Sequence, residues 1–137
     1  MFTAETQIRV RYAETDKMGY VYYGNYAQYY EVGRVEALRA LGLSYKTMED
    51  DGVMLPVFNF EIQYFKPAFY DDLLTIKTSI IEIPKARIIF EYETYNEKGE
   101  QLNKGKTTLV FIDAATNKPR PAPAYIREKL KQYFPAA

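Results

Sequence analysis

The stretch NYAQYYEVGRVEALRALG, residues 25–42, decides the fold. Its apolar positions recur with the 3.6-residue period of a helix and form one continuous side. Val32 and Val35 lie on the opposite side, which predicts a helix covered on more than one face. Gly42 is typical of a helix end, because glycine adopts the left-handed backbone conformation at little cost. The predicted buried side consists of Tyr26, Tyr30, Gly33, Ala37, Ala40 and Leu41.

Segments with period-two alternation flank this helix on both sides and predict strands. One segment, residues 6–12, precedes the helix, and Pro123 opens a short amphipathic helix near the C-terminus. This order predicts an α+β fold with a five-stranded antiparallel sheet and one long helix across it. Such a sheet leaves an edge strand open, which favours pairing between two copies. The four strands predicted after the long helix cover approximately residues 57–64, 74–80, 88–94 and 101–112.

Length and charge indicate a single domain, residues 1–137, that binds neither nucleic acid nor an anionic membrane. Lys plus Arg and Asp plus Glu number 18 each, so no net field attracts a polyanion. Residues 1–5 lack the basic and apolar regions of a signal peptide, and no apolar run approaches the roughly 18 residues of a membrane helix. We therefore expect a cytoplasmic protein without a membrane span.

The residue types that are missing narrow the chemistry. The chain has no Cys and no His, which excludes thiol catalysis, thiolate metal sites and the usual general base. Serine occurs only at Ser44 and Ser79, and neither can belong to a Ser-His-Asp triad. An enzyme with this sequence would work with carboxylates, tyrosines, basic side chains, backbone amides and helix ends.

Residues 11–26, RYAETDKMGYVYYGNY, resemble the signature of the 4-hydroxybenzoyl-CoA thioesterase family, which has the hotdog fold. Two weaker blocks are similar to later parts of that family. Residues 64–72 resemble the end of its second strand, and residues 106–113, followed by 119–121, resemble its last strand. The resemblance extends in the same order over essentially the whole chain. The matching positions of the first block and the following helix are Thr15, Asp16, Gly19, Val21, Tyr22, Asn25, Tyr26 and Glu31.

The resemblance implies hydrolysis of an acyl-CoA thioester in a homodimer, often paired into a homotetramer, with the active site between subunits. It makes Asp16 the nucleophile or the general base, which would form a mixed anhydride or deprotonate a water. Backbone N–H groups around Tyr23, Gly24 and Asn25 would then stabilise the negative charge on the thioester oxygen. Neither a metal nor another cofactor is needed. Without the motif, Asp16 would be interpreted as a solvated turn or cap residue.

Tyr23 and Glu31 are the further catalytic candidates. Many relatives carry His where this chain has Tyr23, and tyrosine does not titrate near neutrality, so the role of that position does not transfer directly. Glu31 is predicted to support Asp16; its alternative role is an ion pair with Arg34 three residues later. Gly24, Asn25 and Tyr26 are the expected substrate contacts next to them.

Lys85 and Arg87 are the expected contacts for the phosphates of CoA, with Lys104 and Lys106 completing the best local basic patch. Their alternative role is ordinary solubilising charge at strand ends. Two other functions remain open at this point. One is hydrolysis of acyl groups from acyl carrier protein, and the other is a non-catalytic acyl-binding or scaffolding hotdog protein.

Overall fold

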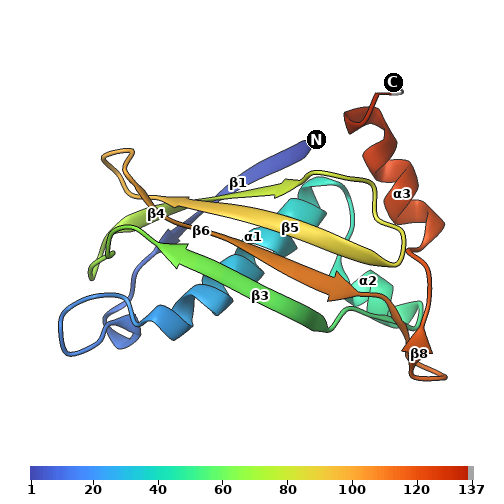
Figure 1. Ribbon diagram of the computed structural model, residues 1–137, viewed down its shortest axis with the longest axis horizontal. Helices are drawn as coiled ribbons and strands as arrows, with labels where there is room; N and C mark the ends of the chain where they lie inside the picture. Colours follow the sequence, from blue (N-terminus) through green and yellow to red (C-terminus); the bar gives the residue numbers. More distant parts are fainter. Residues whose placement is uncertain (136–137) are drawn as a thin grey trace.

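A five-stranded antiparallel sheet forms the centre of the molecule, with the strand order β1-β4-β5-β6-β3 (Figure 1). The computed structural model describes residues 1–135. The five-stranded sheet and the helices confirm the predicted α+β architecture. The strands are β1 (Phe2–Arg9), β3 (Val57–Tyr64), β4 (Leu73–Ile80), β5 (Arg87–Tyr95) and β6 (Gln101–Val110).

The long helix α1 (Tyr26–Ala40) crosses one face of the sheet (Figure 1). The predicted buried side is confirmed at every position except Ala40, which is exposed. Of the two valines predicted on the opposite side, Val32 is 41% exposed and Val35 is half-buried, so that side is only partly covered in a single chain. Gly42 ends the helix with φ +80°, and the N–H of Leu43 donates to the carbonyl of Leu38 at 2.9 Å, as in a Schellman motif.

Glycine allows the helix to approach the sheet closely. A Cβ on Gly33 would lie 2.6 Å from Oγ1 of Thr78, and one on Gly105 would lie 2.5 Å from Cε2 of Tyr30. The space freed at Gly105 lets the rings of Tyr30 and Tyr92 stack with centroids 4.2 Å apart. These contacts fix α1 over β4, β5 and β6, and so fix where its N-terminus lies.

Several boundaries differ from the sequence expectation. β1 begins at Phe2 and ends at Arg9, and the chain then forms a short 3-10 helix, η1 (Tyr12–Glu14), in place of the predicted strand end. The helix α2 (Tyr45–Asp50) and a small second sheet were not predicted, because their segments are too short to show a clear periodicity. The C-terminal helix α3 (Ala124–Leu130) follows Pro123 as expected and continues into η3 (Lys131–Tyr133). The small sheet consists of β2 (Val53–Met54), β7 (Ile112–Asp113) and β8 (Lys118–Pro119).

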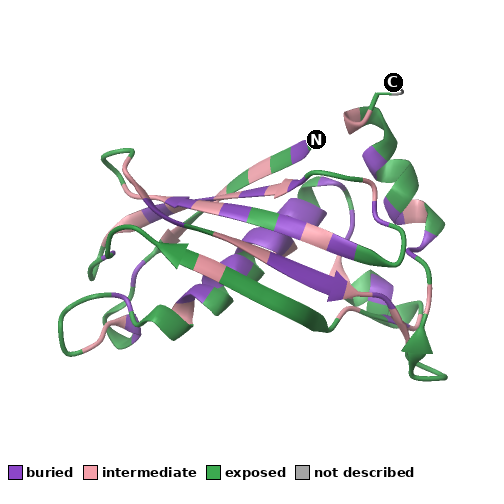
Figure 2. Cartoon of the chain, viewed as in Figure 1, coloured by how far each residue is buried: buried purple, intermediate pink, exposed green. Residues whose placement is uncertain are grey.

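The edge strand β3 is exposed along almost its whole length, in contrast to the half-buried strands beside it (Figure 2). Only Ile62 among its eight residues is partly covered. Phe58 is 67% exposed and Val57 is 48% exposed. No helix within residues 1–135 is long and apolar enough to cross a membrane.

Candidate active site

Asp16 lies in the connection between β1 and α1, in a tight turn of its own (Figure 1). Its Oδ1 atom accepts hydrogen bonds from the N–H of Met18 at 2.9 Å and the N–H of Tyr20 at 3.2 Å. Gly19 has φ +82° and closes the turn by donating to the carbonyl of Asp16. Within residues 1–135, Oδ2 of Asp16 has no hydrogen-bond partner. One carboxylate oxygen is thus fixed by the backbone, and the other remains available to an incoming group.

The Asp16 turn is attached to the sheet through the residues that follow it. The N–H of Val21 donates to the carbonyl of Ala68 at 2.8 Å, and Tyr20 forms an antiparallel bridge with Phe69. These contacts lie in the connection between β3 and β4. The turn therefore sits against the end of the sheet at which β3 finishes.

The start of the helical region provides backbone N–H groups next to this turn. A 3-10 segment, η2 (Tyr23–Asn25), runs directly into α1. Its first hydrogen bond runs from the N–H of Asn25 to the carbonyl of Tyr22, so the N–H groups of Tyr23 and Gly24 precede the bonded turns. Three backbone N–H groups were predicted as oxyanion donors. The N–H of Asn25 already donates to Tyr22, so the prediction is wrong for Asn25. Its side-chain Nδ2 donates to the carbonyl of Glu14 at 2.7 Å.

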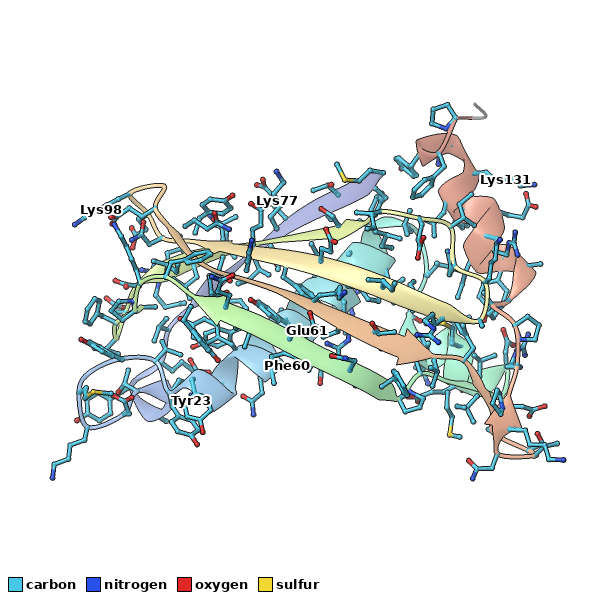
Figure 3. All side chains as sticks on the ribbon, viewed as in Figure 1. Tyr23, Phe60, Glu61, Lys77, Lys98 and Lys131 are labelled. Atoms are coloured by element: carbon cyan, nitrogen blue, oxygen red, sulfur yellow. The ribbon has the colours of Figure 1, made fainter. Side chains whose placement is uncertain are left out.

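Tyr23 is 65% exposed and lies at the start of α1, near the end of β3 (Figure 3). Its carbonyl accepts a hydrogen bond from the hydroxyl of Tyr64 at 3.2 Å, and its ring lies 4.8 Å from the ring of Tyr22. A hydrogen bond with Tyr23 raises the pKa of Tyr22. Through the hydrogen bond from Tyr64, Tyr23 is linked to the exposed edge strand β3.

Tyr26 is 2% exposed, and its ring packs edge-to-face on the rings of Tyr29 and Tyr64. Burial raises the pKa of its hydroxyl, with further contributions from Tyr64 and Asp72. In a single chain Tyr26 packs against Tyr64, whose hydroxyl donates to the carbonyl of Tyr23. Its contact with substrate stays a prediction.

Glu31 lies on the exposed side of α1. The alternative ion pair with Arg34 is wrong within the described residues, because Arg34 is buried and its Nε donates to the hydroxyl of Tyr45 at 3.0 Å. Nothing in residues 1–135 joins Glu31 to Asp16 by a hydrogen bond. Its supporting role stays a prediction.

Lys85 and Arg87 lie at the opposite end of the sheet from Asp16. Lys85 precedes β5 and Arg87 begins it, whereas Tyr95 at the other end of β5 pairs near the exit of β1. A nine-residue strand spans roughly 30 Å, so one chain does not bring these cations to Asp16. The guanidinium of Arg87 lies 5.6 Å from the ring centre of Phe58 on the edge strand.

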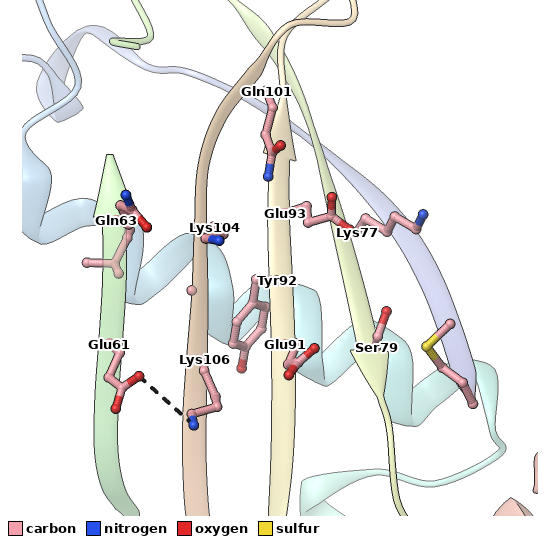
Figure 4. Close-up of a pocket in the computed structure, with 13 residues that line it drawn as sticks. Glu61, Gln63, Lys77, Ser79, Glu91, Tyr92, Glu93, Gln101, Lys104 and Lys106 are labelled. Carbon is pink, nitrogen blue, oxygen red and sulfur yellow. Dashed lines mark ion pairs between the residues drawn. The ribbon is translucent and has the colours of Figure 1, made fainter. Parts of the chain in front are cut away.

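Lys104 and Lys106 lie on the open face of the sheet, away from α1, where a hollow of about 730 Å³ is found (Figure 4). Acidic and basic side chains alternate across its strands: Lys106 is flanked by Glu61, at 4.0 Å, and Glu91. Acyl pockets are mainly apolar, so this charged face does not suit an acyl group. The basic patch predicted from the sequence is thus split between two places.

A second hollow, of about 520 Å³, lies close to the Asp16 turn. It reaches Phe69, the residue that pairs with Tyr20. Its wall includes Lys66 and Lys98, two cations that the sequence pattern did not distinguish. Lys66 follows β3 and Lys98 lies between β5 and β6, and the strand order brings these two connections together.

Glu14 is a further residue near Asp16 that the sequence analysis did not select. It is 8% exposed, although it lies in a polar segment. Its carboxylate accepts a hydrogen bond from the hydroxyl of Tyr29 at 2.9 Å, and Tyr29 lies fifteen residues later in the chain. Its other partner, Arg11, is local, but the contact with Tyr29 on α1 leaves no pattern in the sequence around Glu14.

Comparison with known proteins gives consistent results. Residues 10–130 match the model of the thioesterase-like superfamily. Acyl-CoA thioester hydrolase YbgC of Escherichia coli O157:H7 is 32% identical over 125 residues, which are 91% of this chain and 93% of YbgC. Long-chain acyl-CoA thioesterase FadM of Escherichia coli K12 is 30% identical over 129 residues, 93% of this chain and 97% of FadM.

Among solved structures, DHNA-CoA thioesterase from Staphylococcus aureus is similar with a TM-score of 0.85 and 40% identity. The match covers 98% of this chain and 85% of that one. The similarity in sequence and in structure thus extends over nearly the whole chain, including the Asp16 turn.

Proposed function

The chain belongs to the thioesterase-like superfamily, and we propose that it hydrolyses the thioester bond of an acyl-CoA with Asp16 as general base or nucleophile. The protein is a thioester hydrolase of the hotdog fold, like the acyl-CoA thioesterases that it matches. One observation carries the assignment of Asp16. Its carboxylate is anchored through Oδ1 by two backbone amides, and Oδ2 is left without a partner in residues 1–135.

This geometry suits both mechanisms open to a carboxylate. As a general base, Oδ2 of Asp16 accepts a proton from a water that attacks the thioester carbonyl. As a nucleophile, Oδ2 attacks that carbonyl and the C–S bond breaks, so that CoA leaves as the thiolate. Water then hydrolyses the mixed anhydride, which regenerates Asp16 and releases the proton that converts the thiolate to the thiol. In both cases the anchored Oδ1 keeps the reacting oxygen in a fixed direction.

The negative charge that develops on the thioester oxygen needs hydrogen-bond donors. The N–H groups of Tyr23 and Gly24 precede the first bond of the helical region and lie at its positive end. A donor of this kind is typically worth about 3 kcal/mol in the transition state. We assign both amides to this role.

A second copy of the chain completes the site in this proposal. The exposed strand β3 offers unpaired backbone groups, and antiparallel pairing of two β3 strands would join the two sheets. Such pairing turns one strand around, so the Tyr64 end of one copy meets the Phe58 end of the other. Arg87 lies over Phe58, and Tyr64 is bonded to Tyr23. Pairing therefore carries Arg87 of the partner subunit toward Tyr23 and Asp16.

The finer assignments follow from the same residues. The motif around Asp16 favours the 4-hydroxybenzoyl-CoA thioesterase family within the superfamily, and with it a homodimer or homotetramer. A cytoplasmic location is also part of the proposal. An acyl-carrier-protein thioesterase would need a strong basic docking surface, and the balanced charge of this chain offers none overall. CoA is therefore the proposed thiol carrier.

Release of free CoA from a panel of short-chain, long-chain and aryl acyl-CoAs tests this function. We expect wild-type protein to turn over at least one of them, and Asp16→Asn to lose about a hundredfold or more in kcat. Asparagine keeps the shape of Asp16 but lacks a basic carboxylate. Asp71→Asn, in an exposed turn, is the matched control and should keep the wild-type rate. Equal rates for wild type and Asp16→Asn would refute the assignment of Asp16. Hydrolysis of acyl groups from acyl carrier protein, with no acyl-CoA cleaved, would refute CoA as the thiol carrier.

A further inference from the structure

Glu14 is a buried carboxylate beside the proposed catalytic turn, and neither mechanism uses it. It lies two residues before Asp16, at the end of η1. Buried acids are rare unless they are paired, and each one needs a physical reason. Its contacts show what it holds together.

The carboxylate of Glu14 joins the exit of β1 to the first turns of α1. Oε1 accepts the N–H of Arg11 at 2.8 Å and the hydroxyl of Tyr29 at 2.9 Å. Oε2 accepts Nε and Nη2 of Arg11 at 3.2 and 3.0 Å. Four donors from two elements thus converge on one side chain.

The backbone carbonyl of Glu14 holds the other end of the loop. It accepts the N–H of Tyr22 at 2.9 Å and Nδ2 of Asn25 at 2.7 Å. Tyr22 and Asn25 immediately flank Tyr23 and Gly24, whose amides are the proposed oxyanion donors. Glu14 is therefore bonded to the residues on both sides of those donors.

Glu14 is not itself placed to act as the base. Both of its oxygens are occupied by donors, and its charge is balanced by Arg11. By contrast, the segment it anchors is largely exposed: Tyr12 is 76% exposed and Met18 is 69% exposed. An exposed loop with few apolar contacts needs fixed points of this kind to hold one geometry.

We propose that Glu14 is a positioning residue for thioester hydrolysis, which ties the Asp16 turn to the start of α1 so that Asp16 and the amides of Tyr23 and Gly24 face the same carbonyl. This inference rests on the proposed function of Asp16. Because displacement of a reacting group by about 1 Å can cost on the order of a hundredfold in rate, such an anchor acts on kcat.

Glu14→Gln tests the proposal, because the amide keeps the volume but directs an NH2 group at donors and removes the charge. We expect kcat to fall about ten- to a hundredfold while KM changes by less than about threefold. The acid limb of the pH–rate profile should persist, because the variant keeps the proposed base, Asp16. Loss of that limb would mean that Glu14 is the base, and an unchanged kcat in folded protein would also overturn the proposal.

Tyr29→Phe is the graded companion, because it removes one hydrogen bond to Oε1 and leaves Arg11 in place. We expect a smaller loss of kcat in the same direction. In the double variant the losses should not multiply, since both changes act on one contact. Losses that multiply in full would contradict an anchor shared by Glu14 and Tyr29.

Hydrogen exchange separates failure of this proposal from failure of the proposed function. Amides of residues 15–22 should exchange faster in Glu14→Gln than in wild type, whether or not any thioester is cleaved. Faster exchange with an inactive wild type would refute the function and keep the anchor. If Asp16→Asn lowers kcat while Glu14→Gln changes neither kcat nor hydrogen exchange, the anchor is refuted and the proposed function stands.

Discussion

At the residue scale, the fold depends on a few positions where no other side chain fits. Gly105 is the clearest, because a Cβ there would lie 2.5 Å from Cε2 of Tyr30 and 2.7 Å from the backbone carbonyl oxygen of Glu61. The backbone oxygen cannot move without disturbing β3. Asp16 is the functional counterpart, since its turn requires the positive φ of Gly19.

We expect Gly105→Ala to destabilise the protein by about 1–3 kcal/mol, because the added methyl group overpacks the contact between β6 and α1. Urea unfolding measures the effect. Lys104→Ala, on the exposed neighbour, should change the free energy of unfolding by less than about 0.5 kcal/mol. A Gly105→Ala variant as stable as wild type would show that the contact is looser than described.

At the element scale, the connection from β1 to α1 is the part that function depends on. Burial alone raises the pKa of Glu14, but the N–H of Arg11, the hydroxyl of Tyr29 and the Arg11 guanidinium together hold it below its ordinary value of 4.5. A carboxylate with a lowered pKa stabilises the folded state above that value, and the contribution is lost as the pH falls further. The anchor should therefore weaken in acid.

The free energies of unfolding of wild type and Glu14→Gln should differ most near neutral pH, and the difference should shrink as the pH falls below 4.5, the ordinary pKa of Glu14. The reason is that the unfolded wild-type chain gains a proton there before the folded chain does. Denaturant unfolding at a series of pH values measures the difference. A gap that stays constant down to about pH 3 would mean that Glu14 is not held ionised.

Elements with a strong period were predictable, and those that depend on long-range placement were not. The stripe of α1 and its end at Gly42 follow from local pattern, and both are confirmed. Helix α2 was missed because its six residues, YKTMED, have too little apolar periodicity. Asp16 was found through its motif. Glu14 was missed because the local Arg11–Glu14 pair is ordinary in a polar segment, and the contact with Tyr29 on α1 is not visible in the sequence.

At the scale of the whole molecule, the strand order determines which predicted residues can meet. Alternation in residues 57–64 indicated a strand, but not that β3 would be an exposed edge. Lys85 and Arg87 were chosen as local cations, and the sheet separates them from Asp16 by the length of β5. In the proposed site, a second copy in antiparallel contact along β3 supplies these cations.

Subunit complementation tests most directly whether the active site is shared between two copies. Asp16→Asn and Arg87→Glu are prepared separately, and then unfolded and refolded together in equal amounts. We predict that each variant alone has a low kcat/KM, and that the mixture recovers about a quarter of the wild-type activity. About half of the dimers then contain both variants, and each of these has one intact site. A mixture no more active than the separate variants would place Asp16 and Arg87 in the same site of one chain, and a fully active Arg87→Glu would remove Arg87 from the site; either result contradicts the account.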